Sequence, residues 1–246
     1  MSRSEVIVPL DFGGGKIAKL TVTELMTAAD REFLARLASN ASVAYDVGAF
    51  TGSSGEAILC GMKPDGVCYS VDTFRGMGGP DDYPSQVPRW FIISAWTARL
   101  ARFGDRARLY VGESAEFARM QKPDTADLVF LDAAHSYSAV VADIDAWAPV
   151  LKSGGILAGH DFDKRLTTIP VEEIQKHRDM ELTGIDFGGG GEIVHLGVAA
   201  AVMESFEGFG VAEDPDSTIW WVQKPGRTGP YRPPDPRTTP SPSRSS

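Results

Sequence analysis

The sequence is poor in cysteine and has no long apolar run, and these absences exclude several classes of protein. Cys60 and Cys68 are the only two cysteines in 246 residues, too few and too close for a disulfide framework. We expect buried thiols in a reducing compartment. No stretch approaches the ~18 uninterrupted apolar residues of a membrane span, and the first residues lack the apolar core of a signal peptide. The sequence therefore predicts a cytoplasmic protein without a membrane partner.

Positive charge is also scarce. The chain has 24 Lys and Arg against 33 Asp and Glu, a net charge of −9. Nucleic acids and anionic membranes bind clustered lysine and arginine, so we expect neither as a partner. Residues 225–246 differ, with four Arg, one Asp and seven Pro. Their scarcity of aliphatic residues predicts a disordered Pro/Arg-rich tail.

Apolar content of 43% is ordinary for a globular protein, and strand-like and helix-like segments alternate through the chain. The expected strands are Val43–Val47, Gly66–Val71, Ala107–Val111, Leu128–Leu131, Ile156–Ala158 and Thr218–Gln223. The expected helices are Thr21–Ala38, Ser53–Met62, Trp90–Phe103, Ser114–Met120, one within 137–151, one within Thr167–Glu181, and Leu196–Phe206. Residues 1–20 read as an arm or short strands, 74–87 as a loop and Gly188–Gly191 as a flexible turn. This alternation predicts an α/β domain with a mostly parallel sheet.

Residues 128–162 are the most informative segment. The apolar run Leu128–Leu131 stops at Asp132, and a helix-like segment with one apolar face then extends to Leu151. The glycine-containing stretch 152–155 is expected to end that helix. A second apolar run ends at Gly159, directly before a histidine and an aspartate. Parallel sheets bind ligands beyond the carboxyl ends of their strands, so the chemistry is expected to use Asp132, His135, His160 and Asp161.

A glycine-containing turn follows the first strand of the domain. Gly48 and Gly52 form a Gly-x-x-x-Gly pattern, which differs from the Gly-x-Gly-x-x-Gly of dinucleotide sites. Asp46 precedes it and would repel a pyrophosphate, whereas it suits a cationic ligand such as S-adenosylmethionine (SAM). Asp72 ends the next strand, where a carboxylate accepts hydrogen bonds from ribose hydroxyls. The alternatives are a merely tight turn at the glycines and a capping or solvated acid at Asp72.

With these motifs the chain resembles a class I SAM-dependent methyltransferase. It is similar to the group with Asp-x-x-His-x-Tyr, here Asp132 to Tyr137, and Gly-Gly-x-x-x-x-His-Asp, here Gly154 to Asp161. That group includes small-molecule O-methyltransferases of antibiotic and sugar tailoring and members labelled cephalosporin hydroxylase-like. The resemblance covers Val43–Phe162 well and Gly197–Val202 and Ile219–Lys224 weakly.

The resemblance implies a fold and a division of the chain. The fold is a Rossmann-like, seven-stranded, mostly parallel sheet with helices on both faces, in a single domain. An N-terminal arm and helix would occupy residues 1–42, and the SAM-dependent methyltransferase domain 43–224. A lid-like insertion at about 163–195 and the loop 76–90 would select the acceptor, because loops at the ligand end of a sheet usually do so.

The resemblance also implies roles for particular residues. The cofactor would contact Asp46, Gly48, Ala49, Gly52, Asp72, Thr73, Gly112, Glu113, Ser114 and Asp132. At Gly112 to Ser114 the alternative is simple helix capping. A divalent ion, Mg²⁺ or Mn²⁺, would bind Asp132, His160 and Asp161.

One departure from the family pattern concerns the base. Relatives often read Asp-Gly-Asp-His where this chain has Asp132-Ala133-Ala134-His135, so a second carboxylate is missing and metal dependence is in doubt. His135 could then serve as the general base, because an imidazole with a pKa of ~6.5 is largely neutral near pH 7. A hydrogen-bonded or packing role is the alternative for His135 and His160, and Tyr137 is expected to pack or to contact the helix start.

These features predict methyl transfer from SAM to a hydroxyl of a small metabolite, a sugar or secondary-metabolite intermediate. Asp132, His135 and His160 would be catalytic, with a divalent metal assisting. The alternatives are a hydroxylase or oxidoreductase on the same fold and a non-catalytic SAM-binding protein. A homo-oligomer is compatible with the sequence.

Overall fold

The computed structural model describes residues 5–11, 17–23, 25–76, 87–163, 169–179, 185–186 and 193–225. The predicted turn at Gly188–Gly191 and residues 226–246 of the predicted tail lie outside these ranges, as does most of the loop 74–87.

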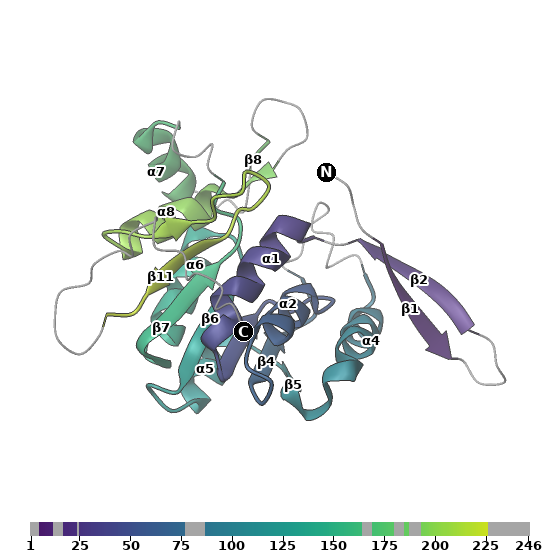
Figure 1. Cartoon of the computed structure of the whole chain (residues 1–246). Helices are drawn as coiled ribbons and strands as arrows, with labels where there is room; N and C mark the ends of the chain where they lie inside the picture. The colour runs from purple at the N-terminus through teal and green to yellow at the C-terminus, as the bar shows by residue number, and fades with distance from the viewer. Residues whose placement is uncertain are drawn as a thin grey trace.

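The centre of the molecule is a seven-stranded sheet with the strand order β10-β11-β7-β6-β3-β4-β5 (Figure 1). Strands β3 to β7 run parallel, whereas β11 is antiparallel to β7 and β10 is antiparallel to β11. The strands are β3 Val43–Val47, β4 Val67–Asp72, β5 Ala107–Val111, β6 Ala126–Leu131, β7 Leu151–Gly159, β10 Gly210–Val211 and β11 Trp220–Gln223. The predicted Rossmann-like sheet is confirmed, and its seventh strand is β10, which the sequence patterns did not locate.

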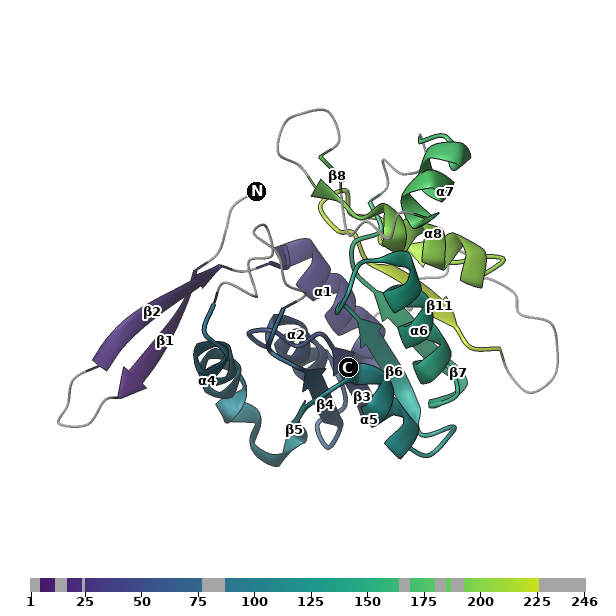
Figure 2. The ribbon, with the colours of Figure 1, turned by 180° about the vertical axis from the view of Figure 1, so that it is seen from behind.

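Helices cover both faces of the sheet (Figures 1 and 2). They are α1 Ala28–Leu37, α2 Ser53–Gly61, α4 Arg89–Leu100, α5 Ser114–Met120, α6 Tyr137–Trp147, α7 Val171–Asp179 and α8 Leu196–Ser205, with 3₁₀ turns η1 Ala38–Asn40 and η2 Ala101–Arg106. Strand β6 shows why helices are needed on both faces of the sheet, because the side chains of Leu128–Leu131 are apolar on either face. Leu128 and Phe130 pack in the core under α1, α2 and α4, while Val129 and Leu131 pack under α5, α6 and α8. A strand buried on two faces reads as a continuous apolar run.

The N-terminal region corrects one prediction. The helix expected over Thr21–Ala38 begins only at Ala28, and Thr21–Thr23 end a hairpin of β1 Glu5–Asp11 and β2 Ile17–Thr23. The helix starts where it does because Thr27 and Asp30 form a capping box: each side chain accepts from the other's backbone N–H. The expectation of short strands near the N-terminus is confirmed, and Figure 1 shows the hairpin projecting away from the sheet.

The boundary between α6 and β7 corrects a second prediction. Helix α6 ends at Trp147, so Leu151 and the stretch 152–155 belong to β7. Leu151 pairs with Ala126, and the register then shifts before Leu128 pairs with Ile156. Gly154 adopts a positive φ of 79° inside this irregularity. The glycines thus allow a bulge at the start of a strand rather than ending a helix. The predicted helix within 167–181 is confirmed as α7, which precedes the short pair β8 Ile185–Asp186 and β9 Ile193–Val194.

Candidate active site

The polar loops meet at one edge of the sheet because the strands that carry them are parallel and in register. Val47 pairs with Val71 and also with Leu131, and Leu131 pairs with Gly159. The residues that follow these strand ends therefore lie side by side. Three of the predicted segments, the glycine turn, the loop after β6 and the end of β7, are brought together by this register.

The glycine turn after β3 lies directly against the loop after β6. Gly48 has φ +93°, and a Cβ atom there would lie 1.9 Å from the carbonyl oxygen of Asp132. Gly52 has φ +85° and precedes α2, where a Cβ would lie 3.0 Å from Trp96 Cδ1. The glycines are thus required by the packing of the chain itself as well as suiting close approach of a ligand.

The carboxylate of Asp72 holds two loops together. Oδ2 accepts a hydrogen bond from the Phe50 backbone N–H at 2.7 Å, and Oδ1 accepts one from Phe74 at 2.6 Å. Both donors have positive φ, 40° and 53°, a strained conformation for a bulky residue. Burial raises the pKa of Asp72 even though these hydrogen bonds favour the carboxylate. The second lone pair on each oxygen leaves Asp72 able to accept from a ligand hydroxyl.

Asp46 lies beneath the glycine turn. Its side chain is fully buried, Ser70 Oγ donates to Oδ2 at 3.0 Å, and Oδ1 has no hydrogen-bond partner. Burial raises its pKa to about 7, against the hydrogen bonds from Ser54 and Ser70. The carboxyl group of Asp46 is therefore hydrogen-bonded to β4 inside the fold, two residues before the glycine turn.

The loop after β5 has its polar side chain engaged within the fold. Ser114 Oγ donates to Asp143 Oδ1 at 2.6 Å and accepts from Trp147 Nε1 at 2.9 Å. These contacts join α5 to α6. Glu113 is the N-cap residue of α5 but makes no side-chain capping bond. At Gly112 a Cβ would meet the Tyr110 ring at 2.6 Å. Any contact of this loop with adenine would thus use its backbone.

The four ionisable residues predicted at the ends of β6 and β7 form one compact cluster. His135 Nε2 lies 2.9 Å from Asp161 Oδ2, and His160 Nδ1 lies 3.2 Å from Asp161 Oδ1. Asp132 Oδ1 is 3.7 Å from a nitrogen of each histidine. Asp161 has φ +65°. Tyr137 begins α6 and packs against the core, as expected, and its hydroxyl also donates to Glu204 Oε2 of α8 at 2.7 Å.

The carboxylates change the ionisation of the cluster. Burial disfavours a charged His135, but Asp161 and Asp132 outweigh it and raise the pKa of His135 to about 10. Against the same effect of burial, Asp161 and Asp132 raise the pKa of His160 well above its usual value. The two histidines in turn hold the pKa of Asp161 well below its usual range, although burial opposes this. The raised pKa runs against the expectation of a largely neutral His135 near pH 7.

Asp30 completes the cluster, and the sequence patterns did not identify it as a site residue. Its Oδ2 lies 3.2 Å from His160 Nε2, and its Oδ1 accepts from the Thr218 backbone at 3.1 Å. Burial opposes ionisation, but His160 and Thr27 together lower the pKa of Asp30 to about 2. Its signal in the sequence was the Thr-x-x-Asp capping pattern at Thr27.

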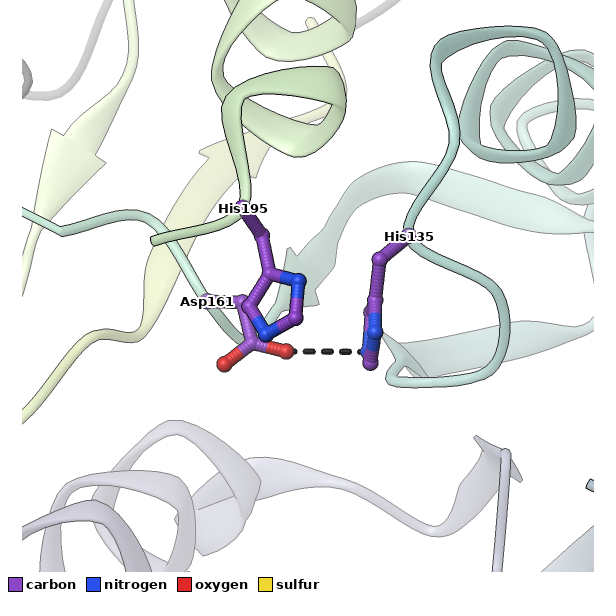
Figure 3. Close-up of side chains that lie close together, drawn as sticks. All are labelled: His135, Asp161 and His195. Carbon is purple, nitrogen blue, oxygen red and sulfur yellow. Dashed lines mark ion pairs between the residues drawn. The ribbon is translucent and has the colours of Figure 1, made fainter. Parts of the chain in front are cut away.

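His195 is a second residue of the cluster that the sequence patterns did not identify. It is the N-cap residue of α8, and its ring centroid lies 4.2 Å from that of His135. Figure 3 shows both imidazoles beside the carboxylate of Asp161. The sequence holds only four histidines, and one placed directly before a predicted helix was the available signal.

The residues present fit a divalent ion. Asp132, His160 and Asp161 each offer a ligand atom, and these atoms lie within 4.8 Å of one another. Oxygen donors with one imidazole suit Mg²⁺ or Mn²⁺.

Of the described helices, none has the length and apolar content needed to cross a membrane.

The parallel strand order β5-β4-β3-β6-β7 with an antiparallel β11, a glycine turn after β3 and an acid ending β4 is the arrangement that the resemblance to class I SAM-dependent methyltransferases predicts. Residues 46–162 match the family model described as a methyltransferase domain. That match spans the glycine turn, Asp72 and the cluster. Over these residues the chain is similar to the methyltransferase-domain family. None of the curated proteins compared with the chain matches it.

Solved structures share this fold at low sequence identity. A Corynebacterium glutamicum protein is 19% identical with a TM-score of 0.54, covering 82% of this chain and 83% of its own. The O-methyltransferase TomG of Streptomyces achromogenes, involved in tomaymycin synthesis and solved with SAM, is 14% identical with a TM-score of 0.52, covering 81% of each chain. An O-methyltransferase of Bacillus cereus in complex with SAH, 12% identical with a TM-score of 0.50, covers 81% of this chain and 82% of its own.

Proposed function

We propose that this protein transfers the methyl group of SAM to a hydroxyl of a small metabolite, a sugar or secondary-metabolite intermediate, with a divalent ion held by Asp132, His160 and Asp161. One observation carries the proposal. The glycine turn and the ionisable cluster are in direct contact, because Gly48 has no room for a Cβ beside the Asp132 carbonyl. A cofactor bound at the turn would thus have its reactive end beside the cluster.

The cofactor side of the site rests on preorganised loops. SAM supplies an electrophilic methyl group. Asp72 presents carboxylate oxygens to the ribose hydroxyls while its other lone pairs fix the loops at Phe50 and Phe74. Gly48, Ala49 and Gly52 form the turn beside the methionine part, with Asp46 supporting it from below. Thr73 and the backbone of 112–114 border the remainder. Holding two reactants in fixed geometry lowers the barrier to their reaction.

The acceptor side rests on the cluster. A divalent ion bound there would act as a Lewis acid for the acceptor oxygen. His160 lies between the carboxylates of Asp161 and Asp30. We assign the acceptor's proton to His135, whose Nε2 faces the same two carboxylates. Oxygen as the acceptor atom is supported by these donors and by relatives of the same fold that are O-methyltransferases.

Calorimetry with SAM and with NAD tests the cofactor. We expect SAM to bind and NAD not to bind, because the turn lacks the second glycine that makes room for a pyrophosphate. Asp72→Asn should weaken SAM binding by about 1.5–3 kcal/mol, the typical effect of a hydrogen bond to a charged group. The control is Asp124→Asn, at an exposed acid. NAD binding without SAM binding would contradict the proposal.

Methyl transfer to hydroxylated acceptors, with and without EDTA, tests the cluster. Asp132→Ala and His160→Ala should each lower kcat at least about tenfold, since each removes a predicted ligand of the ion, and EDTA should do the same to the native protein. Asp124→Ala is the matched control. If both cluster variants kept full activity, the site would be wrong.

A further inference from the structure

Three donor groups meet at a point that the predicted metal set does not use. His135, Asp161 and His195 each offer a ligand atom, and these atoms lie within 4.8 Å of one another. The residues come from the loop after β6, the end of β7 and the start of α8, three parts of the chain that converge in Figure 3. All three are partly shielded from solvent.

The two oxygens of Asp161 face different histidines. Oδ1 is 3.2 Å from His160, which belongs to the predicted set, whereas Oδ2 is 2.9 Å from His135. The backbone N–H of Asp161 donates to Thr218 Oγ1 at 3.2 Å, which fixes this positive-φ residue in place. A carboxylate held in this way presents one oxygen to each of two separate donor sets.

The nitrogens of His135 have the burial and the position of metal ligands. Both are buried, and neither has a hydrogen-bond partner, although Nε2 lies at ion-pair distance from Asp161. His195 occupies the N-cap position of α8, but its side chain makes no capping bond there. Buried polar groups are normally hydrogen-bonded, so a buried imidazole beside a carboxylate but without an aligned hydrogen bond is suited to bind a cation.

Gly197 fixes the position of His195. A Cβ at Gly197 would lie 2.4 Å from the carbonyl oxygen of His135 and 2.7 Å from the backbone nitrogen of Tyr137. The start of α8 therefore lies directly on the loop after β6. This contact places the N-cap residue of α8 beside His135 and does not depend on where any ligand binds.

We propose that His135, Asp161 and His195 form a binding site for a first-row transition-metal ion, such as Fe²⁺, Co²⁺ or Zn²⁺. Two imidazoles and one carboxylate select borderline ions over Mg²⁺, and three protein ligands leave coordination positions open. The site goes beyond the proposed function, because it needs neither SAM nor methyl transfer. It is also distinct from the predicted oxygen-rich set, with which it shares only Asp161.

The test is a titration of the metal-free full-length protein with Co²⁺, followed by visible absorption and by calorimetry. His195→Asn removes the imidazole and leaves a side chain that favours the N-cap position. His177→Asn, which removes the remaining histidine of the sequence, is the matched control. Asp132→Asn reports on the predicted set. Circular dichroism and SAH binding confirm that each variant is folded.

We expect the native protein and His177→Asn to bind Co²⁺ with the same ligand-field spectrum, and His195→Asn to bind at least about tenfold more weakly, since it lacks a direct ligand. Absence of Co²⁺ binding by the native protein would overturn the site. Unchanged affinity of folded His195→Asn for Co²⁺ would also overturn the site. This holds as well if Asp132→Asn is the variant that loses the ion, because the ion would then occupy the predicted set. Because SAH binding is measured separately, failure of this site would leave the proposed methyl transfer untouched.

Discussion

At the scale of single residues, Gly48 and Gly154 separate two reasons for a glycine. Both have positive φ, +93° and +79°, but their surroundings differ. Gly48 faces the Asp132 backbone at a distance no Cβ could occupy, whereas the nearest atom to a Cβ at Gly154 is Gln223 Nε2 at 3.9 Å. The positive φ alone explains the glycine at 154. Gly48 in addition allows the glycine turn to contact the loop that carries Asp132.

Alanine at the two glycines should therefore have unequal effects. Gly154→Ala should lower the free energy of unfolding by about 1–2 kcal/mol, the cost of a left-handed conformation with a Cβ. Gly48→Ala should lower it by on the order of 3–5 kcal/mol, because the backbone must also move, and should abolish SAM binding. Urea denaturation and calorimetry measure both. Equal destabilisation by the two changes would show that the contact with Asp132 is unimportant.

Asp127 gives a pH dependence whose sign can be worked out. It accepts from the backbone N–H groups of Ser42 and Val43 at 2.9 and 3.0 Å and from Lys152 Nζ at 2.7 Å. Burial opposes ionisation, but these donors outweigh it and lower the pKa of Asp127. A lowered pKa contributes stability that is present above the unfolded value of ~3.9 and lost as the pH falls through the folded value.

Asp127→Asn should thus lower the free energy of unfolding by about 1–2 kcal/mol at pH 7, with the difference from the native protein shrinking below pH ~4. Urea denaturation from pH 7 to pH 3 measures this. Asp124→Asn, at an exposed acid paired with Lys224, is the control and should change stability by less than about 1 kcal/mol. A difference that grew on acidification would contradict the assigned pKa shift.

At the scale of elements, the start of α1 is joined to the active-site cluster. Thr27 and Asp30 cap the helix, and the same Asp30 carboxylate faces His160 and accepts from Thr218 before β11. The position of the helix and the charge beside His160 are consequently set by one residue. Asp30 therefore connects the start of α1 to the segment that precedes β11.

Thr27→Ala should lower the free energy of unfolding by about 1–2 kcal/mol, because a helix N–H loses its side-chain acceptor. Thr27→Ser retains the hydroxyl and should keep most of that stability. Thermal unfolding of the three proteins compares them directly. An unaffected Thr27→Ala protein would mean that the cap does not determine where α1 begins.

Helix α8 acts on the site through its first turn. Gly197 allows its start to lie against the His135 carbonyl, and the apolar residues Val198 to Val202 anchor the rest in the core beneath α6. An element far along the chain from β6 thus supplies His195 to the cluster. The proposed transition-metal site depends on this packing.

At the scale of the whole molecule, local patterns were enough to predict the sheet and the edge that carries the site. The apolar run of β6 and the polar residues directly after β6 and β7 depend on neighbours in the sequence, so Asp132, His135, His160 and Asp161 could be placed together. Asp30 and His195 could not, because their side chains reach the cluster only through the packing of α1 and α8. The raised pKa of His135 could not be predicted for the same reason: it depends on carboxylates brought close by folding.

The central claim is that the domain transfers the methyl group of SAM to an oxygen atom. The most direct measurement uses SAM labelled with ¹³C in its methyl group, a panel of monosaccharides and catechols, and NMR of the products. The account predicts a labelled methyl ether, formed with SAH, whose formation falls at least about tenfold in the Asp132→Ala protein. Label found on nitrogen or carbon, or labelled ether formed equally by Asp132→Ala, would contradict it.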